Sequence, residues 1–221
     1  MRSLAQARLH KLPVTRQAEA MAPRLADFSA RFAAIEREII TDTPTWYASF
    51  ENQGEYPLRK SGAAGGTCVW TTGNRVLSAQ NTISMEIWFW LDSVGGGNLF
   101  DNGRGGANGY SISLDGSAKI VATAQGVAIL TTGTNACTAK AWNQVVVKKA
   151  ATSGGIWTYY LNGAVDLANA GTANPVAPSA DVRTVIGPGN ETGKPRIYVA
   201  MAATYTSALS DARVLAHWNA I

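Results

Sequence analysis

The chain has 221 residues and a net charge of +4, and only 15% of its residues are charged, against roughly 25% in a typical soluble domain. This length is sufficient for one sizeable hydrophobic core with an appended segment. The low charge, the 22 glycines and the short aromatic or β-branched runs are typical of an all-β domain rich in turns. No apolar run approaches the roughly 20 residues that a membrane-spanning helix needs, so we expect no membrane partner.

The positive charge is concentrated at the N-terminus. Residues 1–41 contain seven Arg or Lys and four Asp or Glu, which gives +3, whereas residues 42–221 contain twelve and eleven, which gives +1. A solvated helix face is the interpretation we favour, and an arm seated on an acidic protein surface is the alternative. Nucleic acid is an unfavoured partner, because the basic residues are not interleaved with aromatic ones. The opening residues MRSLAQARLHKLPVTRQ lack the apolar stretch of a secretory signal, so we expect synthesis in a cytoplasm.

The first predicted elements are helices. Residues 3–12 are expected to form a short helix that Pro13 ends. From position 21, apolar residues recur at spacings of four, three, four, three and four, which is the pattern of a coiled-coil seam. Pro23 fits the first position of a helix that continues to about Ile40. The seam residues are Met21, Leu25, Phe28, Phe32, Ile35 and Ile39.

This amphipathic helix has two interpretations. It can pack its apolar face on the remainder of the same chain, or it can use that face for self-association or docking, which we favour. We expect a homo-oligomer, and the bulky Phe and Ile residues at seam positions favour a trimer at least as much as a dimer. Residues 41–45, TDTPT, end the helix. We therefore expect a helical arm over residues 1–44 and a second domain over residues 45–221.

The densest apolar and aromatic run is ISMEIWFWLD at residues 83–92. Alternate residues of a strand face opposite sides of a sheet. One predicted face carries Glu86 with Trp88 and Trp90. The other predicted face is fully apolar and comprises Met85, Ile87, Phe89 and Leu91. A strand of this kind is usually central and covered on both sides, so we predict a two-sheet sandwich built around it.

Short candidate strands separated by turns fill the rest of the chain. Asn162-Gly163 predicts a type I′ hairpin turn. The chain is expected to end in a short helix with Ser207 or Ser210 near its start. The other strands are expected at residues 46–50, 56–60, 67–71, 75–78, 98–101, 110–114, 119–124, 127–132, 142–149, 156–161, 183–186 and 196–205.

The order of these motifs resembles the laminin-G-like domains of the concanavalin A-like lectin/glucanase superfamily. The similar segments are SMEIWFWL at 84–91, WNQVVV at 142–147, WTYYLNG at 157–163, VIG at 185–187 and YTSALS at 205–210. The resemblance covers roughly residues 45–221. It implies a mainly β fold, a concanavalin A-like jelly-roll sandwich of two antiparallel sheets, here with an N-terminal helical arm and a short C-terminal helix.

The chain departs from this family at one acidic position. The family often has an Ile-Asp-Glu-Val step before its closing tyrosine, whereas this chain has Val199-Ala200-Met201-Ala202. This difference argues against a calcium site at that step. The aspartates are scattered singly along the chain, so we predict no metal site and no cofactor, although ligands from separate loops are an alternative.

The residues that hydrolases use are not arranged as a catalytic site. Glycosidases generally need two carboxylates about 5–10 Å apart. The superfamily's glucanases show an ExDxE pattern, but Glu86 stands alone, and we expect it to be a paired or rim carboxylate. His10 and His217 are expected at the surface or in packing. We therefore predict a non-enzyme without catalytic residues.

Aromatic side chains beside amide groups are candidates for stacking on a sugar. The resemblance implies that Trp88 and Trp142 occupy positions where the family buries a core tryptophan, and Trp88 is therefore left out of the candidates. The candidates for glycan contact are Trp70, Trp90, Trp157, Tyr159 and Asn162. Cys68 and Cys137 are expected to be buried free thiols rather than a disulfide.

Two functions from different classes fit this sequence. We favour a non-enzymatic virion structural protein of a bacteriophage, such as a capsid decoration protein, a head fibre or a tail accessory protein. It would dock or oligomerise through its arm, display a lectin-like sandwich, and have itself and other virion proteins as partners. A domain of this type without a secretory signal suits a protein that is made in the host cytoplasm and released by lysis. The alternative is a carbohydrate-binding module for adsorption to a cell surface.

Overall fold

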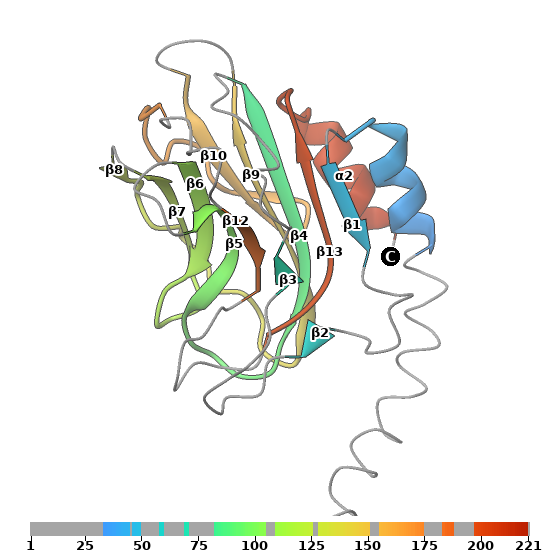
Figure 1. Ribbon diagram of the computed structural model, residues 1–221, viewed down its shortest axis with the longest axis horizontal. Coiled ribbons are helices and arrows are strands. Elements are labelled where there is room, and N and C mark those ends of the chain that lie inside the picture. Colours follow the sequence, from blue (N-terminus) through green and yellow to red (C-terminus); the bar gives the residue numbers. More distant parts are fainter. Residues whose placement is uncertain are drawn as a thin grey trace, which may run out of the picture.

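The computed structural model describes residues 33–44, 46–49, 58–59, 69–70, 82–104, 109–125, 128–150, 155–174, 183–187 and 197–220. Within these ranges the strands form two antiparallel sheets that pack face to face (Figure 1). A helix over residues 33–41 and helix α2 (Asp211–Asn219) lie on the outer side of one sheet. This architecture confirms the prediction of a mainly β jelly-roll sandwich with a helix at the N-terminal side and a short C-terminal helix.

The sheet that carries the helices is called sheet A. Among the described residues it has seven strands in the order β1-β13-β4-β9-β10-β11, with β2 also paired to β13. The strand β4, which contains the predicted central run, lies between β13 and β9. The members of sheet A are β1 (Trp46–Ser49), β2 (Leu58–Arg59), β4 (Ile83–Leu91), β9 (Ala141–Lys149), β10 (Trp157–Leu161), β11 (Ala164–Leu167) and β13 (Ile197–Tyr205).

The second sheet is called sheet B. Its six described strands follow the order β3-β12-β5-β6-β7-β8. The strand expected at residues 75–78 and the helix expected at residues 3–12 lie outside the described residues. The members of sheet B are β3 (Val69–Trp70), β5 (Gly97–Arg104), β6 (Gly109–Leu114), β7 (Ile120–Gln125), β8 (Ala128–Ile129) and β12 (Arg183–Ile186).

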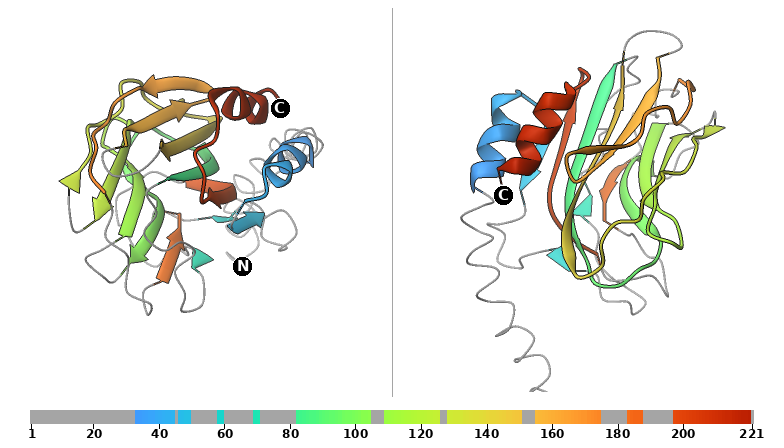
Figure 2. Two further views of the ribbon diagram at one scale, coloured as in Figure 1. Left: turned by 90° about the horizontal axis from the view of Figure 1, so that it is seen from above. Right: turned by 180° about the vertical axis from the view of Figure 1, so that it is seen from behind.

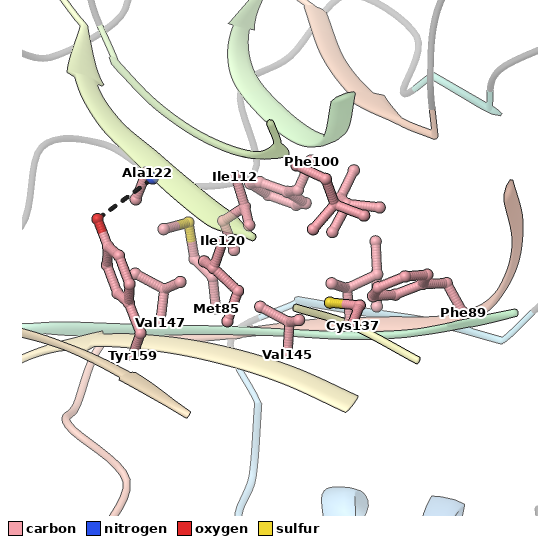
Figure 3. Close-up of a cluster of buried hydrophobic side chains, with 14 of the residues drawn as sticks. Met85, Phe89, Phe100, Ile112, Ile120, Ala122, Cys137, Val145, Val147 and Tyr159 are labelled. Carbon is pink, nitrogen blue, oxygen red and sulfur yellow. Dashed lines mark hydrogen bonds between the residues drawn. The ribbon is translucent and has the colours of Figure 1, made fainter. Parts of the chain in front are cut away.

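The main hydrophobic core lies between the two sheets. Sheet B contributes Phe100, Ile112 and Ile120 to it, facing the side chains of β4 (Figure 3). The contribution of β4 is the predicted apolar face, and each of its side chains is at most 1% exposed: Met85, Ile87, Phe89 and Leu91. The alternation read from the sequence is therefore confirmed, because consecutive β4 residues point to opposite sides of sheet A.

A second buried cluster lies on the outer face of sheet A, beneath the helices. Figure 2 shows the two helices next to each other on this face. The N-terminal helix contributes Ile35 and Ile39, and α2 contributes Val214. The sheet contributes Trp88, Val146, Tyr160, Ala200, Met201, Ala203 and Tyr205. The strand β4 is thus covered on both faces, as its sequence predicted.

Local sequence explains why α2 begins where it does. The side chain of Ser210 accepts a hydrogen bond from the N–H of Arg213 at 3.2 Å, which caps the first turn. Of the two serines predicted near the helix start, Ser210 is the cap. Upstream, Ser84 of β4 accepts a hydrogen bond from the N–H of Leu209 at 2.8 Å. This bond attaches the segment before α2 to the central strand.

The predicted hairpin turn joins β10 to β11. Asn162 and Gly163 have φ angles of +53° and +78°, and the type I′ turn requires positive φ at both positions. The N–H of Gly163 donates to Gln144 Oε1 at 3.0 Å. A Cβ atom added at Gly163 would lie 2.8 Å from the Cβ of Trp218 on α2. Glycine is therefore needed here both for the backbone conformation and for the close approach of the helix.

We expect Gly163→Ala to lower the free energy of unfolding by about 2 kcal/mol or more, because a left-handed conformation and a steric clash add together. Urea unfolding followed by tryptophan fluorescence measures this change. Gly116→Ala is the matched control, because a Cβ at Gly116 meets nothing within 4 Å. Its effect should stay within about 0.5 kcal/mol. Equal losses in the two variants would contradict the packing described for the hairpin.

Candidate functional site

Glu86 is the centre of a buried polar network on the outer face of sheet A. Its carboxylate belongs to a residue that is 1% exposed. Oε1 accepts hydrogen bonds from Trp88 Nε1 at 2.8 Å and from Gln144 Nε2 at 2.7 Å. Oε2 accepts a hydrogen bond from the Tyr205 hydroxyl at 3.3 Å and lies 2.9 Å from His217 Nδ1. One carboxylate thereby links the three adjacent strands β13, β4 and β9 to helix α2.

His217 lies between this carboxylate and a second one. Its Nε2 is 2.9 Å from Asp42 Oδ2, which is an ion-pair distance without the alignment of a hydrogen bond. Two negative charges at this distance favour the imidazolium form, which carries a proton on both nitrogens. Burial alone would lower the pKa of His217. The hydrogen bond and charge of Glu86, with the charge of Asp42, outweigh burial and raise that pKa above its usual value.

Arg213 connects α2 to the N-terminal helix. Its Nε donates to both carboxylate oxygens of Asp42, at 2.8 and 3.0 Å. One terminal nitrogen donates to the Glu38 carboxylate at 2.9 Å and to the Glu38 carbonyl at 3.1 Å. These hydrogen bonds with Asp42, and next those with Glu38, raise the pKa of Arg213. The segment 33–44 is therefore fixed to α2 by ion pairs and to sheet A by apolar contacts.

A second polar contact holds the start of α2. Lys148 Nζ donates to Asp211 Oδ1 at 2.5 Å and to the carbonyl of Leu209 at 3.0 Å. The Tyr160 hydroxyl donates to the same Asp211 oxygen at 2.7 Å. These hydrogen bonds, from Lys148 first and then from Tyr160, lower the pKa of Asp211. Because the side chain of Asp211 is 72% exposed, solvent screens this contact far more than the contacts of Glu86.

The chemistry available to Glu86 is limited by its surroundings. Its oxygens face donors from the protein itself, and the side chain has no exposed surface. Asp42, the other carboxylate that contacts His217, faces the helix interface. The expectation of a paired carboxylate is confirmed for Glu86. Its partner could not be predicted, because 131 residues separate Glu86 from His217 and no local pattern joins them.

The described part of the chain offers no metal centre: no group of three or more His, Cys, Asp or Glu residues there is placed to hold an ion. Within the same ranges, no helix is long and apolar enough to cross a membrane. Cys137 is a buried free thiol, as predicted, and burial raises its pKa to about 12. Cys68 lies outside the described residues.

The structure describes two of the six predicted seam residues. Ile35 and Ile39 are fully buried against the outer face of sheet A of the same chain. This burial corrects the expectation of an intermolecular contact at these two positions, because the sheet already covers them. The other four seam positions lie outside the described residues, and self-association through them stays a prediction: Met21, Leu25, Phe28 and Phe32.

The residues predicted to contact a glycan do not form one site. Trp157 and Tyr159 are fully buried in the core between the sheets. The Tyr159 hydroxyl accepts a hydrogen bond from the N–H of Ala122 at 3.2 Å (Figure 3), and Trp157 Nε1 donates to the carbonyl of Ala173 at 2.7 Å. Strand alternation directs both side chains inward, so the expectation of a surface contact is wrong for them.

Asn162 and Trp70 are two further candidates for glycan contact. The side-chain oxygen of Asn162 accepts a hydrogen bond from the N–H of Gln144 at 2.8 Å. Asn162 therefore closes the hairpin onto β9 rather than presenting its oxygen to a ligand. The side chain of Trp70 lies outside the described part of the structure.

Trp90 keeps a partly exposed side chain on the outer face of sheet A. It lies opposite Trp142 of β9, and the two rings meet edge to face with centres 5.9 Å apart. Trp142 packs against the cluster beneath the helices but is only partly buried, so the core position that the resemblance implied is met only in part. Farther along this face, Trp88 is fully buried and stacks on Trp218 of α2 at 5.7 Å. Aromatic rings therefore extend from beneath α2 to a half-buried pair, Trp90 and Trp142.

We expect Glu86→Ala to lower the free energy of unfolding by about 3–5 kcal/mol, because it leaves the buried His217 without its carboxylate. Guanidinium unfolding at pH 6 measures the loss. Asp211→Ala removes a carboxylate that is 72% exposed and leaves the buried Lys148 with the Leu209 carbonyl as a partner, so its effect should be smaller, about 1–2 kcal/mol. A loss of similar size in both variants would contradict the central role of Glu86.

The chain matches one known protein family over most of its sandwich. A laminin-G-type family model described as the concanavalin A-like lectin/glucanases superfamily matches residues 63–215. A search of curated proteins gives no match.

Several solved structures share the fold. They include a botulinum neurotoxin type C structure, reported for cell entry that depends on two ganglioside molecules, with a TM-score of 0.54, 14% identity, and coverage of 73% of this chain and 41% of that one. The binding domain of Paraclostridial Mosquitocidal Protein 1 has a TM-score of 0.55 and 13% identity over 73% of this chain and 42% of that chain. The botulinum neurotoxin serotype D binding domain has a TM-score of 0.52 and 13% identity, with coverage of 73% of this chain and 41% of that chain. This chain thus spans about two fifths of their length, and at such identity the similarity shows the fold alone.

Proposed function

The chain belongs to the concanavalin A-like lectin/glucanase superfamily, and from this premise we propose that it is a non-catalytic display protein. The observation that supports this function is the burial and full pairing of the Glu86 carboxylate. It is buried beneath α2 and bound by donors of the protein. Glycoside hydrolysis requires two carboxylates that reach the scissile bond. A carboxylate in this environment anchors helices and has no route to a substrate.

The N-terminal arm is the proposed attachment device. Residues 33–41 pack on the sandwich through Ile35 and Ile39, and the same apolar spacing continues toward residue 21. Twelve further helical residues would add about 18 Å of apolar face. We propose that this face buries itself against further copies of the chain, with a trimer favoured, or against another virion protein. Arm attachment with outward display of a sandwich suits a bacteriophage capsid decoration protein, head fibre or tail accessory protein.

We expect the double variant Phe28→Asp with Phe32→Asp to be monomeric, because two charges on the seam oppose burial between chains. Light scattering gives the mass, and far-ultraviolet circular dichroism should show an unchanged β-type spectrum. Ala26→Asp with Ala30→Asp is the matched control, since it places the same two charges off the seam and should keep the oligomer. Oligomers of unchanged mass in the seam variant would exclude this attachment.

Binding of a cell-surface carbohydrate is the second proposed function. The observation that favours it is the half-buried Trp90–Trp142 pair on the outer face of sheet A. Aromatic rings that keep one part exposed provide an apolar platform for the face of a sugar ring. The botulinum neurotoxin type C structure, which shares this fold, is reported for an interaction with gangliosides. That likeness supports a test of glycan binding, but it does not identify the sugar that this chain would bind.

We expect the full chain to be retained on a glycan array, and we expect Trp90→Ala or Trp142→Ala to weaken binding about tenfold or more, as loss of an aromatic contact would. Val165→Ala is the control, because Val165 lies on β11 at the edge of the same sheet and is 49% exposed. It should leave binding unchanged. Absence of binding by the wild-type chain, with and without calcium, would rule out the carbohydrate function and leave the display function standing.

A further inference from the structure

The segment 33–44 is held on the sandwich by apolar and charged contacts in the described part of the chain. Ile35 and Ile39 provide the apolar contacts with the outer face of sheet A. Glu38 and Asp42 provide the charged contacts, and both bind Arg213. Asp42 also lies 2.9 Å from the imidazole of His217. A titratable ring therefore lies among the contacts that hold this segment.

The charge around His217 is unbalanced when the ring is neutral. The carboxylates in contact with the ring are Glu86 of β4 and Asp42 of the segment 33–44. Asp42 also binds Arg213 of α2, whose other carboxylate partner is Glu38. Among the described residues of β13 and β9, the groups that contact Glu86 are neutral, the hydroxyl of Tyr205 and the amide of Gln144. Lys148 of β9 contacts α2 at Asp211 instead. With a neutral ring, Asp42 and Glu38 share the charge of Arg213, and Glu86 has no cationic partner among these groups. A proton on His217 supplies the second positive charge, at the position between Glu86 and Asp42.

The hydrogen-bonding capacity of imidazole leads to the same conclusion. A neutral ring has one N–H group, so only one of its nitrogens, the one beside Glu86 or the one beside Asp42, carries a proton. Glu86 has no exposed side-chain surface, whereas Asp42 is 16% exposed and also binds Arg213. The single proton therefore stays with Glu86. Nε2 is then without a proton 2.9 Å from Asp42 Oδ2, so the contact that loses its ion pair is the one to the segment 33–44.

We propose that protonation of His217 holds the segment 33–44 on sheet A and that loss of this proton releases it. Release exposes the sheet residues that Ile35 and Ile39 cover. The native state binds this proton more tightly than the unfolded chain does, because the pKa is raised by folding. The stabilisation is therefore complete below about pH 6.5 and is lost as the pH rises through the native pKa.

Hydrogen–deuterium exchange of the full chain between pH 5.5 and 9 tests this proposal. Exchange rates are divided by the intrinsic rate at each pH. The protection of amides in residues 33–41 should fall at least tenfold as the pH rises. Amides of β4 and β9 should keep their protection over the same range, since the core between the sheets does not depend on His217. A parallel loss of protection in β4 would mean global unfolding and would overturn the proposal.

Variants assign the response to one histidine. His217→Gln should give low protection of residues 33–41 that no longer changes with pH. His10→Gln is the control, because it removes the other histidine of the chain, and it should respond as the wild type does. If His217→Gln does not fold, Asp42→Asn serves instead, since it keeps the size of the side chain and removes the second carboxylate, and the response should shrink at least threefold. An undiminished response in the variant that folds would overturn the proposal.

Discussion

The carboxylate of Glu86 is buried on the outer face of the central strand, so the surrounding elements have to supply its partners. An ionised carboxylate buried without partners costs several kcal/mol. The strands beside β4 can supply an amide from Gln144 and a hydroxyl from Tyr205, but the cationic partner comes from α2. His217 reaches Glu86 only if α2 lies across sheet A. Arg213, four residues earlier on the same helix, then faces the acids of the segment 33–44.

Apolar packing and the polar network fix the same helix from two sides. Gln144 accepts a hydrogen bond from Gly163 at the tip of the β10–β11 hairpin while donating to Glu86. The hairpin tip lies so close to Trp218 that only glycine fits there. As a result, residues 33–44 and α2 belong to the packed body of the sandwich. The core between the sheets forms from strands alone, whereas the second cluster exists only because helices cover it.

This division of the molecule bears on function. In this chain the central part of the outer face of sheet A is occupied by two helices of the chain itself (Figure 2). The partly exposed aromatic side chains of this face, Trp90 and Trp142, therefore lie beside the helices rather than beneath them. The network under the helices has the residue types of a catalytic site, with His, Asp and Glu in contact. Because this network is buried, it connects β4, α2 and the segment 33–44 instead of meeting a substrate. The strength of this connection depends on the protonation of His217.

The sequence alone determined the features that depend on neighbours along the chain. Period-two alternation in residues 83–92 identified the central strand and its core face, and Asn162-Gly163 identified the hairpin, because both are set by local backbone geometry. Alternation also places Trp157 and Tyr159 on one face of β10, but it does not say which of the two faces of that strand is the inner one. Only the tertiary structure decided that Ile35 packs on its own sheet and that His217 pairs with Glu86. These contacts join residues more than a hundred positions apart or depend on which surface reaches an apolar face first, and no local pattern in a single sequence carries that information.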